Sequence, residues 1–315
     1  MRQFLLVLIV APALLVACKP SAPQRTDDGL VPITVANLAV PNAAALVLGV
    51  NQGLFRAEGL EVTLKDTPAA ATQAAVVSGE AQFGFTNVPA ILAAASNGLP
   101  VRVVGPAGKF ARDNAKVALQ LAVPRDSAIA APKDLEGKRV AVDTLYQLPH
   151  LSLIISARSL GVDTSKITFV ETPFAAMADA LAKHQVDAAD LAEPFLSTEL
   201  ARGARSIVSN GAGFPPETVQ TMWVTSAAYL AEHRATVDRF ARALGKSNDY
   251  AKDHDPELRQ ALATYTRTPP ELIGKILMPY FSTASDRQNF ETYYRTMKEL
   301  GIIKKDFDLG TLFIP

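Results

Sequence analysis

Hydrophobic positions along residues 31–225 follow two periods, one typical of strands and one typical of helices, in alternating segments. Residues 60–64 alternate with a period of two, as strands do, whereas residues 69–77 have a helical pattern that Gly79 ends. Strands that alternate with helices favour a parallel or mixed sheet covered on both faces, so the predicted fold class is α/β. The pattern predicts strands over 33–36, 60–64, 82–85, 101–104, 119–123, 139–142, 167–170, 186–191 and 221–225, and helices around 46–50, over 69–77, from 87 to 98, over 147–160 and over 174–184.

The chain changes character after Gln220. One apolar strand, 221–225, is followed by long helical stretches that Asp255-Pro256, Pro269-Pro270 and Pro279 separate. A globular part of this size is more naturally built as two lobes with separate cores than as one. We predict a first lobe over 31–118, a second lobe over 119–217, and a return of residues 218–315 to the first lobe.

The chain begins with one positive charge and an apolar run. Arg2 precedes an uninterrupted apolar stretch from Phe4 to Ala17, which has the length of a signal-peptide core and is too short to span a bilayer. Leu15-Val16-Ala17-Cys18 resembles the bacterial lipobox, which implies a lipid on Cys18. We therefore predict a lipoprotein signal peptide over 1–17 and a flexible tether over 18–30, with an ordinary signal peptide as the alternative.

Composition limits the partners. Thirty-one basic and 31 acidic residues leave a formal net charge of zero, so nothing suggests a nucleic-acid partner. Cys18 is the only cysteine, so the chain forms no intramolecular disulfide and its stability must come from packed cores.

The sequence offers little chemistry for an enzyme. It contains neither a Gly-x-Ser-x-Gly elbow nor a phosphate-binding Gly-x-x-x-x-Gly-Lys run, and its carboxylates suit solvated helix faces. The four histidines are far apart in the chain, which disfavours a metal site, and we interpret them as surface residues: His150, His184, His233 and His254. We predict no catalytic residue, no metal and no cofactor.

Several phrases, in this order, resemble the solute-binding proteins of bacterial importers for sulfonates, taurine, nitrate and thiamine precursors. The resemblance implies the type II periplasmic-binding-protein fold, in which two crossing segments join two α/β lobes around a ligand cleft. It also implies an extracytoplasmic monomer that delivers a small molecule to an ABC permease and its ATPase. The phrases are 53–62 (GLFRAEGLEV), 77–85 (VSGEAQFGF), 98–101 (GLPV), 134–142 (DLEGKRVAV), 181–188 (LAKHQVDA), Glu193-Pro194 and 221–225 (TMWVT).

Four segments follow predicted strands of such a protein. Ligands of open α/β sheets bind beyond the carboxyl ends of the strands, where helix N-termini offer free N–H groups. The predicted ligand-binding residues are Asn37, Pro41 and Asn42; Thr86 and Asn87; Asp143, Thr144, Tyr146 and Gln147; and Asp190 and Glu193.

Structural roles compete with these assignments. Asn42, Thr86, Asn87 and the pair Asp143-Thr144 are also good helix caps. Tyr146 fits either a stacking wall or a half-buried core position, and Glu193-Pro194 fits either a hinge or a ligand contact. Trp223, the only tryptophan, is more typical of the core.

The second-lobe segment bears on the ligand. Sulfonate binders of the resembled family carry a Gly-Ser-Thr or Gly-Ser-Ser run where this chain has Asp143-Thr-Leu-Tyr146. A carboxylate there repels an anionic head group. Together with Asp190 and Glu193, it disfavours a sulfonate and favours a neutral, zwitterionic or cationic nitrogen compound, such as an aminopyrimidine. A sulfonate-like or nitrate-like anion stays the alternative ligand.

Two other functions remain open. A ligand-sensing subunit of a signalling system would share every feature above. The fungal synthase of the thiamine pyrimidine shares the fold, but it relies on a cysteine-rich segment that this chain lacks.

Overall fold

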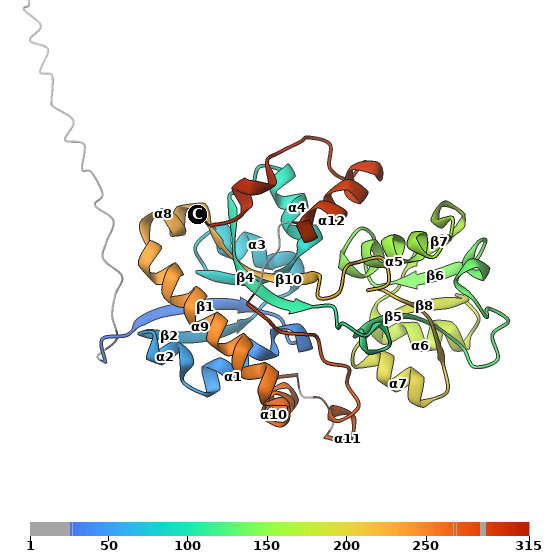
Figure 1. Ribbon diagram of the computed structural model, residues 1–315, viewed down its shortest axis with the longest axis horizontal. Coiled ribbons are helices and arrows are strands. Elements are labelled where there is room, and N and C mark those ends of the chain that lie inside the picture. The colour runs from blue at the N-terminus through green and yellow to red at the C-terminus, as the bar shows by residue number, and fades with distance from the viewer. Residues whose placement is uncertain (1–25, 27, 267, 269, 284–287, 315) are drawn as a thin grey trace, which may run out of the picture.

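The computed structural model describes residues 26, 28–266, 268, 270–283 and 288–314. The predicted signal peptide, Cys18 and most of the predicted tether lie outside the described residues. Within them the strands form two five-stranded sheets, side by side along the long axis of the molecule (Figure 1).

The first sheet has the order β2-β1-β3-β10-β4. Strand β1 is parallel to β2 and β3, whereas β10 is antiparallel to both of its neighbours. Its strands are β1 (Val31–Asn37), β2 (Leu60–Asp66), β3 (Phe83–Asn87), β4 (Val101–Lys109) and β10 (Val219–Ser226).

The second sheet repeats this arrangement in the order β7-β6-β8-β5-β9. Strand β6 is parallel to β7 and β8, and β5 is antiparallel to β8 and β9. The α/β class with mixed sheets is therefore confirmed. The strands are β5 (Leu119–Val123), β6 (Arg139–Val142), β7 (Thr168–Glu171), β8 (Ala188–Ala192) and β9 (Arg205–Ser209), of which β9 was not predicted.

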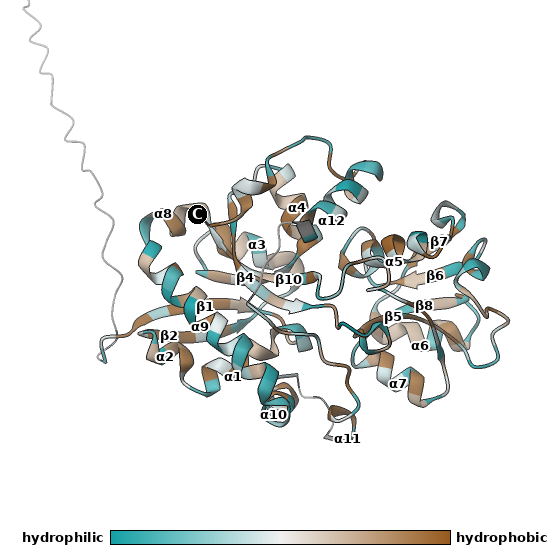
Figure 2. Cartoon of the chain, viewed as in Figure 1, coloured by the Kyte–Doolittle hydropathy of each residue, from teal (hydrophilic) through white to brown (hydrophobic). Residues whose placement is uncertain are grey.

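The helices cover the sheets largely where the sequence pattern placed them. Figure 2 shows hydrophilic stretches along α9 and α10 and hydrophobic ones in α4 and α5. The helices are α1 (Ala44–Asn51), α2 (Leu54–Ala57), α3 (Ala69–Val77), α4 (Val88–Ser96), α5 (Leu148–Ser159), α6 (Phe174–Ala182), α7 (Phe195–Ala201), α8 (Ala227–Glu232), α9 (Arg234–Asp253), α10 (Asp255–Thr266), α11 (Pro270–Ile273) and α12 (Gln288–Glu299).

An aromatic core joins α9 to the first sheet. Phe240 of α9 stacks on Phe83 with 3.8 Å between ring centroids, and Trp223 packs edge-on against Phe85. Trp223 is 1% exposed, so its predicted place in the core is confirmed. Helices α1 and α9 pack closely at Gly49, where an added Cβ would meet the Ser247 hydroxyl at 1.8 Å.

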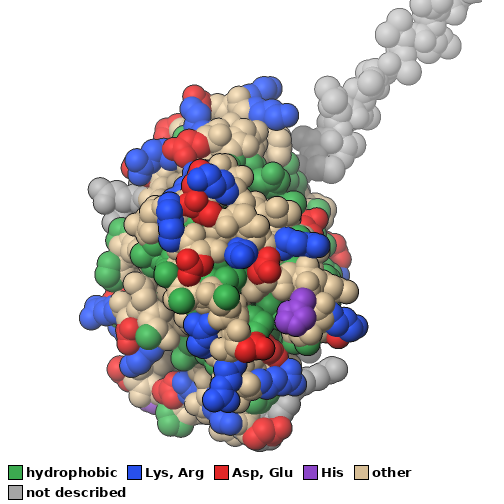
Figure 3. Space-filling model, turned by 90° about the vertical axis from the view of Figure 1, so that its right-hand side faces the viewer, with side chains coloured by type: hydrophobic (Ala, Val, Ile, Leu, Met, Phe, Trp, Pro, Cys, Tyr) green, Lys and Arg blue, Asp and Glu red, His purple; other side chains and the backbone are tan. Residues whose placement is uncertain are grey.

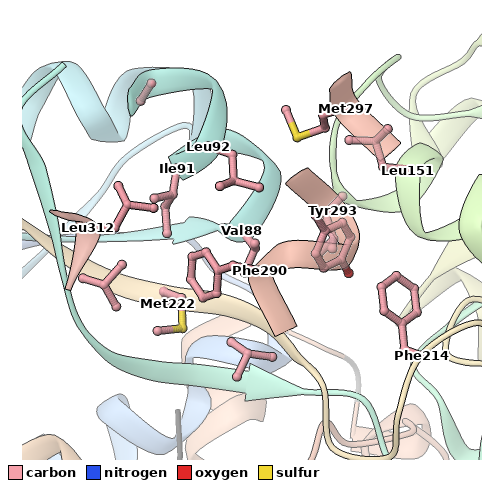
Figure 4. Packing of buried hydrophobic residues seen from close by; sticks show 14 of the residues in the cluster. Val88, Ile91, Leu92, Leu151, Phe214, Met222, Phe290, Tyr293, Met297 and Leu312 are labelled. Atoms are coloured by element: carbon pink, nitrogen blue, oxygen red, sulfur yellow. The ribbon is translucent and has the colours of Figure 1, made fainter. Parts of the chain in front are cut away.

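A second hydrophobic cluster lies between the two sheets. It joins Ile91 and Leu92 of α4 and Tyr293 and Met297 of α12 to Leu151 of α5 (Figure 4). Phe214, from the chain that crosses back to the first sheet, packs on Tyr293 with 4.9 Å between ring centroids. Helix α12 therefore packs between α4, which covers the first sheet, and α5, which covers the second sheet.

The surface is charged with both signs. Figure 3 shows Lys and Arg interspersed with Asp and Glu at the end of the molecule formed by the second sheet and its helices. Among the described residues, no helix combines the length and the apolar character that a membrane crossing needs.

Candidate functional site

The chain crosses between the two sheets from Lys109 to Leu119 and again from Ser209 to Val219. A third connection is the C-terminal segment 275–280, which we call the strap. In the strap, Tyr280 pairs with Lys109 through two backbone hydrogen bonds of 3.0 and 3.1 Å. The sheets are thus linked at three places near the ends of β4 and β10.

Asn37 is the last residue of β1 and lies at the carboxyl end of the first sheet. Its side chain is 1% exposed, and neither amide atom, Oδ1 or Nδ2, has a hydrogen-bond partner among the described residues. Its backbone carbonyl accepts the Thr67 N–H at 2.8 Å. Buried amides without partners are rare in native proteins, which makes Asn37 a candidate for contact with a ligand; as for Asp190, that contact stays a prediction.

Thr221 of β10 is a neighbour of both Asn42 and Asn87. The Asn42 amide donates to the Thr221 hydroxyl at 3.3 Å, and Thr221 is directly opposite Asn87 in the sheet. Pro41 and Asn42 lie in a short 3-10 helix, η1 (Pro41–Ala43), that leads into α1. The structure therefore brings the first-lobe candidates of two segments together.

Of the predicted helix caps, one is confirmed. Asn87 accepts the Ala90 N–H at 2.8 Å and is the N-cap of α4. The cap assigned to Asp143 and Thr144 is wrong, because α5 begins only at Leu148 and its N-cap, Gln147, makes no side-chain cap bond. The Thr144 hydroxyl instead donates to the Asp143 carboxylate at 3.2 Å.

Tyr146 lies in the loop between β6 and α5 in a left-handed conformation, with φ of 63°. This conformation is costly for a non-glycine residue and is often found at functional sites. Its side chain is 47% exposed, so the core alternative for Tyr146 is wrong. Its backbone N–H donates to His150 Nδ1 at 2.9 Å.

His150 is a buried residue, which corrects its interpretation as a surface histidine. Its side chain is 2% exposed and packs edge-on against Phe169 with 4.3 Å between ring centroids. Burial lowers the pKa of His150 to about 4, although the Glu171 carboxylate opposes this shift. The ring is therefore neutral at pH 7 and able to accept the Tyr146 N–H.

Asp190 lies in β8 and is fully buried. Its Oδ2 accepts the Asn210 amide at 3.2 Å, and its Oδ1 has no partner among the described residues. Burial raises the pKa of Asp190 well above its usual value, the Asn210 bond opposes this, and the Asp143 charge adds to it. Asp190 contacts protein on all sides, so its contact with a ligand stays a prediction.

Glu193 follows β8 and connects the second half of the molecule to the strap. Its carboxylate accepts the Ser197 hydroxyl at 2.7 Å and the Leu277 N–H at 2.9 Å. The Ser197 hydroxyl also reaches the Lys275 carbonyl at 2.9 Å. Burial raises the pKa of Glu193, against these hydrogen bonds. The bond to the strap supports the hinge interpretation of Glu193.

Sequence reasoning did not find four residues that shape these surroundings. Glu171 and His150 hold the loop before α5, Asn210 pairs with Asp190, and Leu277 pairs with Glu193. Glu171, Asn210 and Leu277 each contact a residue that is far away in the sequence, so no local pattern indicates the contact. His150 is only four residues after Tyr146, and this spacing could have indicated theirs.

Solved structures share this architecture. The alkanesulfonate-binding protein SsuA from Xanthomonas axonopodis pv. citri bound to MOPS superimposes with a TM-score of 0.72 at 21% identity, over 90% of this chain and 98% of that one. A Candida albicans protein with the generic periplasmic binding protein fold superimposes with a TM-score of 0.67 at 17% identity, over 90% and 96%. The desulfurization enzyme DSZB does so with a TM-score of 0.65 at 18% identity, over 90% and 96%. The chain therefore has the periplasmic-binding-protein fold.

Sequence comparison identifies the family. Residues 40–257 match the family described as "NMT1/THI5 like", and the chain belongs to it. The chain is also 25% identical, over 203 residues, to the taurine-binding periplasmic protein of Escherichia coli strain K12. That match covers 64% of this chain and 58% of the length of the taurine-binding protein.

Proposed function

We propose that this chain is the solute-binding protein of an ABC importer. It captures a small polar molecule between two lobes and delivers it to a permease with an ATPase. The observation that carries the proposal is the buried amide of Asn37, unpartnered at the carboxyl end of a sheet in a binding-protein fold. An amide side chain does not ionise near neutral pH and binds through hydrogen bonds, so it suits recognition better than acid–base catalysis.

We assign residues 31–118 and 218–315 to one lobe and residues 119–217 to the other. Asn37, Pro41, Asn42, Thr86 and Asn87 approach the ligand from the first lobe. Asp143, Thr144, Tyr146 and Gln147 approach it from the second, with Asp190 and Glu193 behind them. Ligand binding favours the closed state because a ligand between the lobes contacts both of them only when they are closed.

The chain acts outside the cytoplasm, anchored by a lipid on Cys18 and without self-association. The sequence of residues 1–18 and the taurine-binding periplasmic relative support this location. An anchor keeps the protein close to its permease and so raises its effective concentration there.

The test is a thermal-shift screen of the purified protein against sulfonates, nitrate, aminopyrimidines and small amines. A ligand that binds only the folded state raises Tm in proportion to the logarithm of its concentration. We expect one class to do so, and the radius of gyration measured by small-angle X-ray scattering to fall on binding. Chemical conversion of the bound compound would contradict the proposal and favour an enzyme, as in the structural neighbour DSZB.

A further inference from the structure

The strap, residues 275–280, places neighbouring side chains in the cores of opposite lobes. Ile276 is 2% exposed and belongs to the apolar cluster of α1 and α10, which lie beside the first sheet (Figure 1). Met278 packs against that same cluster. Leu277, between them in the chain, packs instead against the cluster of α6, α7 and β8 in the second lobe. One short segment therefore joins two separate hydrophobic cores.

Hydrogen bonds from the second lobe reinforce the contact of Leu277. The Leu277 N–H donates to the Glu193 carboxylate at 2.9 Å, and the Lys275 carbonyl accepts the Ser197 hydroxyl at 2.9 Å. Glu193 and Ser197 are both buried, and the Ser197 hydroxyl also bonds to Glu193 at 2.7 Å. One linked pair of side chains in the second lobe therefore binds the strap backbone on both sides of Ile276.

The end of the strap is fixed where the two lobes are connected. Tyr280 pairs with Lys109 through its backbone, and the Arg112 guanidinium lies over the Tyr280 ring, 5.6 Å from its centroid. Arg112 also donates to the Glu217 carboxylate of the second crossing segment. The next residue, Phe281, is 3% exposed and belongs to the α1–α10 cluster. The strap thus returns to the first lobe at its end.

The strap is bound more firmly to the first lobe than to the second. Ile276 and Phe281 are almost completely buried in the first lobe, and Tyr280 adds two backbone hydrogen bonds there. The second lobe contacts one partly buried side chain, Leu277, and two backbone groups. Because apolar burial and hydrogen bonds both favour the first lobe, a movement of the lobes breaks the contacts of the second lobe first.

We propose that the strap is a clasp between the lobes. Its contacts with the second lobe hold the two lobes in the arrangement described here, and lobe movement withdraws Leu277 from the α6–α7 cluster while Ile276 and Tyr280 stay with the first lobe. The inference rests on the proposed capture of a solute between two lobes and deepens it. A ligand that favours another lobe arrangement works against the clasp, so the clasp lowers the apparent affinity by the free energy of its release.

Interlobe distances in the ligand-free protein test the clasp. Two exposed alanines carry the spin labels, through Ala74→Cys on α3 of the first lobe and Ala182→Cys on α6 of the second. The parent is the full chain with Cys18→Ala, so that no third label attaches. Pulsed double electron–electron resonance should show one main distance in the parent. Leu277→Ala should raise the fraction of molecules outside that distance at least about fivefold.

Met278→Ala is the matched control. Met278 is the next residue and is also partly buried, but its side chain packs in the first lobe, so this variant should keep the distance distribution of the parent. Leu277→Met, which nearly conserves side-chain volume, should also keep it. Circular dichroism verifies that each variant is folded. An unchanged distribution in Leu277→Ala, or equal broadening in Met278→Ala, overturns the inference.

Hydrogen exchange tests the release of the strap in the wild type. The Leu277 N–H should exchange through local opening, with a protection factor at least about tenfold below those of the Tyr280 and Lys109 N–H groups. A Leu277 N–H protected as strongly as these two overturns the inference. Neither experiment needs a ligand. Failure of the clasp therefore leaves solute capture standing, whereas failure of the thermal-shift screen with a confirmed clasp counts against solute capture alone.

Discussion

At the scale of single residues, a substitution of Asn37 distinguishes a ligand-binding role of its side chain from a structural role. A buried amide without partners costs folding free energy, about 1–3 kcal/mol. We therefore predict that Asn37→Leu, of similar size, leaves the free energy of unfolding unchanged or raises it by about 1 kcal/mol, and abolishes ligand binding. Urea unfolding and titration calorimetry on the same samples measure the two effects.

Asn248 is the matched control for this substitution. It is equally buried, but its amide donates to the Pro106 carbonyl at 3.0 Å. Asn248→Leu should destabilise the protein, because it leaves a buried carbonyl unpaired, and should spare the ligand site. If Asn37→Leu destabilises the protein as much as Asn248→Leu and binding persists, Asn37 has a structural role only.

The buried imidazole of His150 makes stability depend on pH. Its pKa is about 4 in the folded protein against an ordinary value of 6.5, so between these values the unfolded chain binds a proton that the folded chain does not. Stability should therefore fall as pH decreases from 6.5 to 4, by about 3 kcal/mol from this residue. The raised pKa values of Asp190 and Glu193 act in the opposite direction, so the effect is best measured as a difference.

His150→Gln provides that difference, because glutamine does not titrate and still offers an acceptor to the Tyr146 N–H. The stability of the wild type relative to His150→Gln should decrease by about 3 kcal/mol between pH 7 and pH 4 in urea unfolding. His184→Asn, which removes an exposed imidazole, should follow the wild type. Parallel curves for wild type and His150→Gln would contradict the assignment.

At the scale of elements, the strap depends on Glu193. Glu193→Ala removes the acceptor of the Leu277 N–H and of the Ser197 hydroxyl, so we predict a loss of about 2–3 kcal/mol in the free energy of unfolding. Hydrogen exchange should show faster exchange at Leu277. Asp179→Ala, on α6, is the control: it removes a surface pair with Lys183 and should cost less than about 0.5 kcal/mol. If the two variants are equally stable, the hydrogen bonds of Glu193 do not stabilise the strap and the hinge interpretation of Glu193 is wrong.

The loop before α5 presents Tyr146 as an exposed aromatic. If the ring stacks on the ligand, Tyr146→Ala should weaken binding by more than about tenfold, or about 1.4 kcal/mol, while stability changes little. Leu160→Ala is a suitable control, because Leu160 has a similar exposure, 45%, just beyond the other end of α5. Unchanged affinity in Tyr146→Ala would exclude the ring from the site.

Local pattern predicted most strands and helices here, because each has its own period and its own end signals. The N-cap at Asn87 followed from Asn, Pro and Gly in sequence alone. Strand β9 lacked such a signal, since only Val208 of its five residues is buried. The strap and the Asp190–Asn210 pair join residues far apart in the chain, and no local pattern records such contacts.

At the scale of the whole molecule, two sheets with the same pattern of parallel and antiparallel neighbours are joined by a shared set of crossing segments. The predicted site residues lie near the ends of strands in both sheets, whereas the cluster of α4, α5 and α12 packs between the sheets. Movement of one lobe against the other must therefore bend the three connections. It must also either keep this cluster intact or change its packing. The proposed lobe closure would therefore involve 110–118, 210–218 and the strap together.

The proposed lipid anchor makes the location of the protein depend on Cys18, which is the only cysteine and so forms no intramolecular disulfide. Lipid anchoring adds about 0.8 kcal/mol of membrane affinity per buried methylene group, so its loss should release the protein. We predict that Cys18→Ala moves the protein from the membrane fraction to the soluble fraction and leaves ligand affinity unchanged. Fractionation of cells, with titration calorimetry of the released protein, measures both. A conservative control is Ser21→Ala, three residues further on, which should remain membrane-bound. A Cys18→Ala protein that stays membrane-bound and is processed as before would show that residues 1–17 are an ordinary signal peptide or that another contact holds the protein at the membrane.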